Sequence, residues 1–318
     1  AGKYMEKQRK ITLAILIMLV LISIIAVVDI STRVEKKRSL QAGLNMMATG
    51  HGVAIVRIDG PIELTGPAGF MGRPSGAEAV VKRLADIEKD SNIKAVIIRI
   101  NSPGGTVAAT QEIYHKIISM RKKNITFVAS MGDIAASGGY YIASACNYIV
   151  ANYGTITGSI GVIAYSPNLK NLMDKFGIKM NVIKSGKYKD ILATHRDMSS
   201  EERALLQEMI DLSYHKFVSD IALGRNMNQN DIYPVADGRV MSAQTALKYK
   251  LIDQLGTFDE AISKAKELAG LDADAPVYEE HLSPLNEIFS SMNSLFTGRI
   301  FESRFVDTSN RIEYRYMQ

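Results

Sequence analysis

Residues 94–105 read KAVIIRINSPGG, and residues 125–143 read ITFVASMGDIAASGGYYIA. In both stretches a nearly continuous apolar run ends at small residues and glycines. Such runs are typical of parallel strands that are covered on both faces of their sheet. Helical spacing of apolar residues then follows. Each stretch therefore predicts a strand, a sharp turn and a helix, and this alternation indicates an α/β fold with a mainly parallel sheet.

The rest of the chain adds units of the same kind. β-Branched or apolar runs predict strands at 53–58, 94–100, 125–130, 148–151, 160–164 and 180–183. Helical patterns cover 77–91, 106–122, 138–146, 168–176, 199–223, 242–249 and 258–269. Ser199 or Ser200 is the expected N-cap of the long helix, with Glu201 and Glu202 in its first turn.

The N-terminal segment has a different character. Residues 11–28 read ITLAILIMLVLISIIAVV and carry no charge. At about 1.5 Å per residue this run spans about 27 Å as a helix, close to the thickness of a bilayer core. We predict an uncleaved transmembrane helix, because no small residues suited to signal-peptide cleavage follow the run. Four basic residues precede the span and four follow it, so charge leaves its orientation open.

Composition excludes several classes of protein. The chain has 318 residues, of which 47% are hydrophobic and 22% are charged, and this argues against disorder. The net charge of +5 resides entirely in residues 1–38, so the remainder is neutral and offers no basic face for nucleic acid. Cys146 is the single cysteine, which excludes an intramolecular disulfide and provides no metal-ligand cluster.

Ser137 is the first candidate for chemistry. It lies between a predicted buried strand and a predicted helix that opens with Gly138 and Gly139. The free N–H groups and the positive dipole end at a helix start favour a developing alkoxide or oxyanion. From the local pattern alone, a plain N-cap serine in a packing turn is the alternative interpretation.

A nucleophilic serine needs a base. No histidine occurs between residues 116 and 194, so His195 is the one histidine considered for this role. Lysine is the alternative, because burial favours the neutral amine that accepts a proton. Lys184, Lys187 and Lys189 follow an apolar run, and the local residues do not choose among them.

Two further turns offer supporting groups. Gly104 ends a predicted strand, and its N–H is a candidate second oxyanion donor, although a tight turn also suits glycine. Ser159 begins another predicted strand, where its hydroxyl is suited to holding a lysine amine or to satisfying a turn.

Taken in order, the motifs resemble those of bacterial signal peptide peptidases of the SppA type. The segments concerned are NSPGG at 101–105, MGDIAASGGYYIA at 131–143, TGSIGV at 157–162, SGKYKD at 185–190, ADGRV at 236–240 and LIDQLG at 251–256. The resemblance spans residues 50–270 and depends on the order of the motifs rather than on any one of them. It implies a fold of repeated β-α units like that of Clp protease and crotonase.

The resemblance also implies roles for single residues. The family places its base after a tyrosine, which selects Lys189 over Lys187. No cofactor and no metal is implied. The implied set is the nucleophile Ser137, the general base Lys189, Ser159 to orient that lysine, and the N–H groups of Gly104 and Gly138 as the oxyanion hole.

The implied activity is that of a membrane-anchored serine endopeptidase with a Ser–Lys pair. Such an enzyme degrades remnant signal peptides and other short peptides at the cell membrane, with its catalytic domain on the extracytoplasmic side. In the short, single-copy type, serine and lysine meet across a subunit boundary in a homo-oligomeric ring.

Four alternatives remain. A Ser–Lys protease that trims membrane proteins of the stomatin type shares the fold and the chemistry. A non-catalytic crotonase-fold membrane scaffold would lack the activity altogether. A Clp-type enzyme with a histidine base fits less well, because no histidine follows Ser137 within the next elements. A crotonase-fold acyl-CoA enzyme uses carboxylates and needs no membrane anchor.

The predicted organisation has five parts. They are a cytoplasmic N-terminus at 1–10, the transmembrane helix at 11–28, a stalk at 29–50, the α/β protease domain at 51–283 and an aromatic tail at 284–318. The tail contains four of the nine phenylalanines of the chain. It is expected to pack on its own domain or on a neighbouring protomer.

Overall fold

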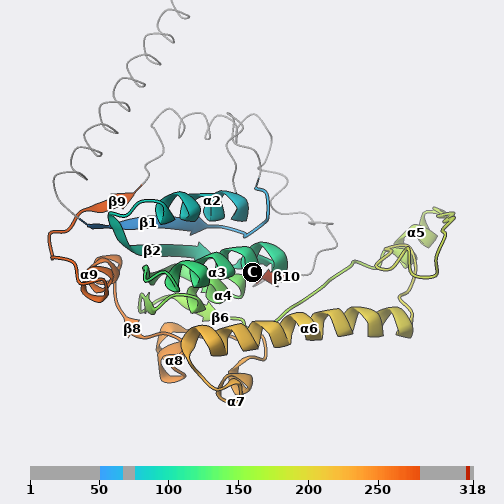
Figure 1. Cartoon of the computed structure of the whole chain (residues 1–318). Coiled ribbons are helices and arrows are strands. Elements are labelled where there is room, and N and C mark those ends of the chain that lie inside the picture. The colour runs from blue at the N-terminus through green and yellow to red at the C-terminus, as the bar shows by residue number, and fades with distance from the viewer. Residues whose placement is uncertain (1–50, 67–75, 280–312, 316–318) are drawn as a thin grey trace, which may run out of the picture. The chain divides into compact units, whose positions relative to one another are not determined.

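A computed structural model of the chain describes residues 51–66, 76–279 and 313–315. These residues form the predicted α/β fold with a mostly parallel sheet (Figure 1). The strands are β1 (Gly52–Asp59), β2 (Ile93–Ser102), β3 (Gly104–Thr106), β4 (Thr126–Ala136), β5 (Tyr148–Ala151), β6 (Ile156–Gly158), β7 (Val240–Ser242), β8 (Gln254–Leu255), β9 (Val277–Glu279) and β10 (Glu313–Arg315). The helices are α2 (Ala77–Glu88), α3 (Val107–Arg121), α4 (Gly138–Ser144), α5 (Lys170–Lys175), α6 (Ser200–Arg225), α7 (Gln229–Ile232), α8 (Ala243–Lys248), α9 (Phe258–Leu268) and the short 3-10 helix η1 (Tyr233–Val235).

Strand β4 is the central strand of the sheet. Parallel pairing places β9, β1, β2 and β4 side by side. Beyond β4 the sheet divides, because Val128–Met131 pair with β5 while Ile134–Ala136 pair with β6. Strand β7 then pairs with β6 in the antiparallel direction. The carboxyl end of β4 thus delivers the chain directly to Ser137.

Strands β1 and β2 are buried on both faces, which explains their continuous apolar sequence. Val53 and Ile55 pack with Ala261 of α9 in one cluster. The alternate residue Val56 lies in a larger core that includes Ile113 of α3. Because side chains alternate across a strand, each face needs its own cover of helices.

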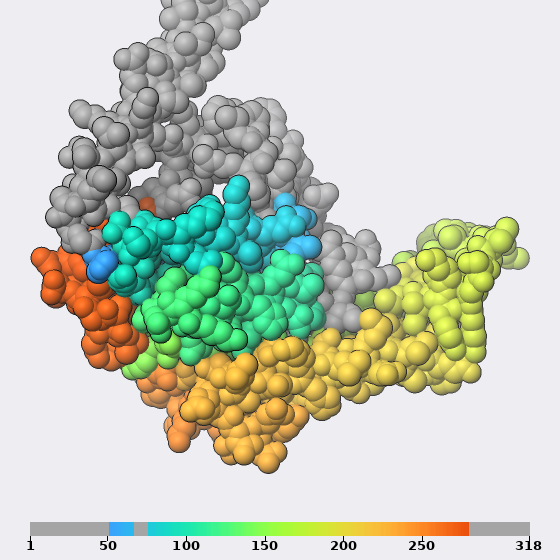
Figure 2. All heavy atoms as spheres, viewed as in Figure 1, coloured from blue at the N-terminus to red at the C-terminus, as the bar shows by residue number. Residues whose placement is uncertain are grey.

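Two predicted strands do not form. Residues 160–164 and 180–183 belong to no strand in the described part of the chain. They fall in or next to residues 164–199, here called the arm, which leaves β6 and returns at the N-terminal end of α6 (Figures 1 and 2, yellow-green). Ile183 in this segment is 101% exposed. Apolar residues at 180–183 are therefore a surface feature of the arm and not a pattern of sheet burial.

The arm is fastened to the start of α6 by a capping box and an arginine. The Ser199 hydroxyl accepts a hydrogen bond from the Glu202 N–H (3.2 Å), and the Glu202 carboxylate accepts one from the Ser199 N–H (2.9 Å). Arg196 donates to Glu202 (2.5 and 2.9 Å) and to Asp190 (2.9 and 3.0 Å). Hydrogen bonding from Arg196 lowers the pKa of Glu202 to about 2 and also lowers the pKa of Asp190.

Across residues 51–66, 76–279 and 313–315, no helix has both the length and the apolar character required to cross a bilayer. The span predicted at 11–28 lies outside these residues, as do the N-terminus at 1–10, the stalk at 29–50 and most of the tail at 284–318. The division into these parts stays a prediction.

The attachment of the arm is expected to weaken in acid. Because the folded pKa of Glu202 (about 2) lies below its ordinary value of 4.5, its contribution to stability is present above pH 4.5 and is lost as the pH falls toward 2. Hydrogen exchange corrected for intrinsic rates should therefore show protection of residues 190–199 falling between pH 5 and pH 2.5. In Arg196→Gln the protection should already be low at pH 5. Arg239→Gln, which removes an ion pair with Asp237 outside the arm, is the control. Equal behaviour of the two variants would contradict this assignment.

Candidate active site

Ser137 lies in a strained turn between β4 and α4. Its backbone has φ 52° and ψ −117°, a conformation that non-glycine residues rarely adopt. The surrounding backbone fixes it, because the Ser137 N–H donates to the Gly158 carbonyl (2.8 Å) and the Tyr141 N–H donates to the Ser137 carbonyl (2.9 Å). The side chain is 1% exposed, and its Oγ has no hydrogen-bond partner among the described residues. A buried hydroxyl without a partner is costly and points to a group that acts on something outside the chain.

The two predicted oxyanion glycines lie against each other beside Ser137. A Cβ atom added to Gly138 would lie 3.2 Å from the Cα of Gly104 and 2.8 Å from the Thr110 Oγ1. This close approach requires glycine at position 138. Gly138 also begins α4, where the first N–H groups have no partner within the helix. The fold thus brings Ser137, Gly138 and Gly104 together from β4, α4 and β3.

The N–H of Gly104 is engaged within the chain. It donates to the buried Ser102 Oγ (3.1 Å), while the Gly104 carbonyl accepts from the Ile62 N–H (2.9 Å). The backbone φ of Gly104 is 108°, which L-residues rarely adopt. The predicted second oxyanion donor is therefore close to the serine but bonded to Ser102 in this structure.

Ser159 lies directly after the residue that binds Ser137. The Gly158 carbonyl accepts from the Ser137 N–H, and the Ser159 N–H donates to the Arg239 carbonyl (2.7 Å). Ser159 is 7% exposed and has a positive φ of 51°. The end of β6 thus places a second buried serine one residue after the carbonyl that binds Ser137, and its role in orienting Lys189 stays a prediction.

Lys189 is not joined to this serine pair within one chain. It lies in the arm, its side chain is exposed, and no ion pair or hydrogen bond links that side chain to a described residue. A lysine base requires burial, yet Ile183 in the apolar run that precedes Lys189 is fully exposed. In a single chain the arm lies at the start of α6 and away from the core that buries Ser137 (Figure 1).

The other two lysines of this segment are held in ion pairs. Lys184 Nζ lies 2.5 Å from an Asp190 carboxylate oxygen, and Lys187 donates to Glu201. The hydrogen bond to Glu201 raises the pKa of Lys187, which is the opposite of what a general base needs. Of the three candidates, Lys189 is the one that no described carboxylate holds.

The described histidines also lie outside the site. His195 is a half-buried residue of the arm, His115 packs against the Tyr114 ring, and His215 contacts the Tyr233 hydroxyl (3.3 Å). None of them is bonded to Ser137 Oγ.

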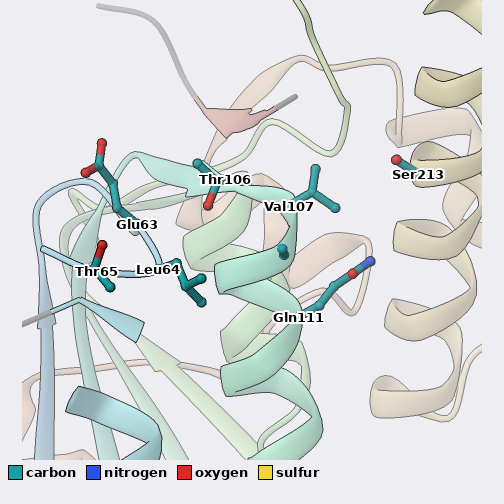
Figure 3. Close-up of a pocket in the computed structure, with 8 residues that line it drawn as sticks. Glu63, Leu64, Thr65, Thr106, Val107, Gln111 and Ser213 are labelled. Carbon is teal, nitrogen blue, oxygen red and sulfur yellow. The ribbon is translucent and has the colours of Figure 1, made fainter. Parts of the chain in front are cut away.

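Two features next to β3 were not predicted from the sequence. Strand β10 pairs with β3 in the antiparallel direction, with Arg315 opposite Gly104 and Tyr314 opposite Gly105. A pocket of about 590 Å³ opens next to β3 (Figure 3). It is lined by Glu63, Leu64, Thr65, Thr106, Val107, Ala108, Gln111 and Ser213. Both features depend on contacts between distant segments, which no local pattern reveals.

Comparison with known proteins agrees with this arrangement. The model of peptidase family S49 matches residues 119–272, and the Clp protease model matches residues 73–150. Together these matches include the strand and helix on either side of Ser137.

Individual relatives extend the match. The chain is 50% identical over 197 residues to a Synechocystis protein provisionally named protease slr0021, covering 62% of this chain and 70% of that one. It is 31% identical over 292 residues to an Enterococcus faecium protein provisionally named signal peptide peptidase SppA, covering 86% and 85%. It is 35% identical over 252 residues to the chloroplastic serine protease SPPA of Arabidopsis thaliana, covering 77% of this chain and 37% of that protein. The chain belongs to peptidase family S49 and is a serine-type protease.

Proposed function

We propose that the protein is a serine endopeptidase with Ser137 as nucleophile and Lys189 as general base. The observation that carries the proposal is the Ser137 side chain, which is buried, unpartnered and held in a strained turn against Gly138 and Gly104. Structural serines normally satisfy their hydroxyl within the fold. An N-cap role fails as the explanation, because the Ser137 side chain makes no capping hydrogen bond to α4.

In the proposed mechanism these residues perform the steps of acyl transfer. The Ser137 Oγ attacks the peptide carbonyl carbon while its proton passes to the neutral Lys189 amine. The carbonyl oxygen becomes an oxyanion that the Gly138 N–H, and the Gly104 N–H once released from Ser102, stabilise. The C–N bond then breaks as Lys189 returns the proton to the leaving amine. Water, deprotonated by the same lysine, releases the acyl group and restores the Ser137 hydroxyl.

The lysine is proposed to come from a neighbouring copy of the chain. The Ser137 Oγ has no hydrogen-bond partner among the described residues, and Lys189 is exposed on an arm that does not reach it. The arm also exposes apolar side chains that a monomer would keep in water, as does the adjacent face of α6. They include Leu172, Phe176, Ile178, Met180, Val182 and Ile183 on the arm and Leu205, Met209 and Leu212 on α6. A second copy that covers these surfaces would desolvate the lysine and favour its neutral form.

A head-to-tail contact of this kind closes into a ring when the rotation allows it. We therefore assign the protein to a homo-oligomeric ring in which each active site is shared by two subunits. A ring also suits the neutral charge of residues 39–318, since no net repulsion opposes association.

The proposed substrates are extended peptides at a membrane surface, remnant signal peptides among them. The edge of β3 accepts an antiparallel strand, as its pairing with β10 demonstrates, and backbone pairing of this kind is a common mode of peptide recognition. The apolar run at 11–28 supports a membrane anchor, and the resemblance to SppA-type peptidases is the basis for proposing that the catalytic domain lies on the extracytoplasmic side. The name of the Enterococcus relative supports signal peptides as the substrate. Trimming of membrane proteins of the stomatin type is the alternative, and profiling of cleaved substrates separates the two.

Loss of the nucleophile is the first test. Ser137→Ala should abolish peptide hydrolysis and labelling by a fluorophosphonate probe, because the attacking oxygen is removed while the turn keeps a small side chain. Ser144→Ala, which removes a buried hydroxyl in the same helix that donates to the Tyr141 carbonyl (2.7 Å), is the matched control and should keep both. Wild-type activity in Ser137→Ala would refute the nucleophile, and an unlabelled wild-type chain would favour a non-catalytic scaffold.

A second test concerns the lysine and the shared site. Lys189→Ala and Lys189→Arg should both lose turnover, because a guanidinium stays protonated near neutral pH. Lys187→Ala, the neighbouring control, should keep most of it. When Ser137→Ala and Lys189→Ala chains are dissociated and reassembled together, random mixing in a ring leaves about a quarter of the sites with both residues intact. Recovery of about a quarter of wild-type activity is therefore expected, whereas a site within one chain predicts none.

Pairing at β3 is tested by competition. A peptide of residues 311–318, RIEYRYMQ, should raise the KM for substrate without changing kcat, because it competes with the substrate for the edge of β3. The same peptide with proline in place of the residue corresponding to Tyr314 should lose this effect, since proline disrupts strand pairing. Equal inhibition by both peptides, or an effect on kcat alone, would refute binding at this edge.

A further inference from the structure

Asp220 of α6 is a buried residue that is hydrogen-bonded to two other helices, α3 and α4, and to Lys216 of its own helix. It is 3% exposed. One carboxylate oxygen accepts from the Tyr141 hydroxyl of α4, and the other accepts from Lys216 Nζ (2.5 Å). Its backbone carbonyl accepts from the Tyr114 hydroxyl of α3 (2.7 Å). A single residue thus connects α6 with both α3 and α4.

The surroundings of Asp220 are those of an apolar core. The Tyr114 and Tyr141 rings lie 4.9 Å apart, and the Tyr141 ring lies 4.6 Å from that of Phe217. Ile221, the next residue of α6, is fully buried. An ionised carboxylate in such a place adds little net stability, because desolvation offsets the attraction it gains. What the carboxylate does provide is direction, since its hydrogen bond holds the Tyr141 hydroxyl in one position, while the backbone carbonyl of the same residue holds the Tyr114 hydroxyl.

The two helices that Asp220 binds are the ones that follow the two oxyanion glycines. Helix α4 starts at Gly138, and Tyr141 lies one turn later. The Tyr141 N–H donates a hydrogen bond to the Ser137 carbonyl (2.9 Å). Helix α3 starts directly after β3, which contains Gly104. The Thr110 hydroxyl in its first turn donates to the Thr106 carbonyl (2.9 Å).

Helix α6 also leads to the base. Its N-terminal end is capped by Ser199 and bound by Arg196, and that is the end from which the arm with Lys189 extends. The Asp220 contacts are therefore polar links between the helix that carries the arm and the two helices that begin at Gly138 and directly after β3.

We propose that Asp220 is a positioning residue, which acts through Tyr141 and Tyr114 to hold α4 and α3 at the separation that the oxyanion hole needs. This proposal rests on the proposed function of Ser137, Gly138 and Gly104. Catalysis requires the donors to face the position of the developing oxyanion, and a displacement of about 1 Å costs about 100-fold in rate. Loss of the Asp220 contacts therefore affects the chemical step rather than substrate binding.

The test compares three full-length variants with the wild-type chain. Tyr141→Phe removes only the hydroxyl that binds Asp220 and keeps the ring in place. Asp220→Asn keeps an acceptor for that hydroxyl and removes the charge that Lys216 pairs with. Tyr214→Phe is the control, because it removes a hydroxyl that binds α6 to the Ala236 carbonyl (2.7 Å), on the side of α6 that meets η1 and not α3 or α4. Each variant is measured for kcat, KM, the fluorophosphonate labelling rate and the urea midpoint.

The expected result separates positioning from stability. Tyr141→Phe should lower kcat and the labelling rate about ten-fold with KM within about two-fold, which corresponds to a partial displacement of the donors. Asp220→Asn should retain more of both rates than Tyr141→Phe, because its amide oxygen still accepts the hydroxyl. Tyr214→Phe should keep both rates even if its urea midpoint falls as far.

The other outcomes are equally informative. If the rates of Tyr141→Phe and Tyr214→Phe fall only in proportion to their urea midpoints, Asp220 is a structural residue and the proposal is overturned. If Tyr141→Phe does not fold, Asp220→Asn becomes the test. If Asp220→Asn folds but reacts no faster than Ser137→Ala, the amide oxygen has not preserved the geometry of the site, and the proposal as stated is overturned. Absence of labelling in the wild-type chain would overturn the proposed function itself and the positioning role with it.

Discussion

The hydrogen bond from the Ser137 N–H to the Gly158 carbonyl is the constraint on which the site depends. It joins the end of β4 to the end of β6 and holds Ser137 in a conformation that a serine would not adopt alone. Such strain persists only where the surroundings over-determine the backbone. Here β4 lies in the centre of a sheet that is covered on both faces, and α4 is buried along its whole length. The packing of the core therefore offsets the free-energy cost of the strained Ser137 backbone.

Glycine is needed where these elements converge. At Gly105 a Cβ atom would lie 1.8 Å from the Ile62 carbonyl oxygen, and at Gly138 it would contact Thr110 and Gly104. The first approach lets β3 lie against Ile62, and the second lets it lie beside the start of α4, so that Gly104 and Gly138 are neighbours. The engagement of Gly104 by Ser102 shows that this proximity does not by itself assemble an oxyanion hole. In the mechanism that we propose, substrate binding releases the Gly104 N–H from Ser102.

The arm is held by different interactions from those that hold the core. Its internal order comes from charged hydrogen bonds around Arg196, while many of its apolar side chains face water. Exposed apolar side chains of this kind mark an interaction surface, and they support the proposal that a second copy of the chain covers the arm. The contrast between Lys187 and Lys189 follows from the same surface. Glu201 holds the first as an ammonium, while the second is left without a carboxylate among the described residues.

Much of the fold follows from the sequence by itself. The continuous apolar runs at 94–100 and 125–130 predicted parallel strands buried on both faces, and Ser199 with Glu202 marked the start of α6, because these signals depend on neighbouring residues alone. The resemblance likewise implied that Ser137, Gly138, Gly104, Ser159 and Lys189 form one site. The fold brings Gly104 against Gly138 and bonds Ser137 to Gly158, while the catalytic roles of these residues stay predictions. Tertiary structure decided the rest. Residues 180–183 have a strand-like sequence but no neighbouring strand, Lys189 stands on an arm outside the core, and β10 pairs with a segment about two hundred residues earlier in the chain. Each of these outcomes depends on which surfaces meet in three dimensions, and a local pattern of side chains contains no such information.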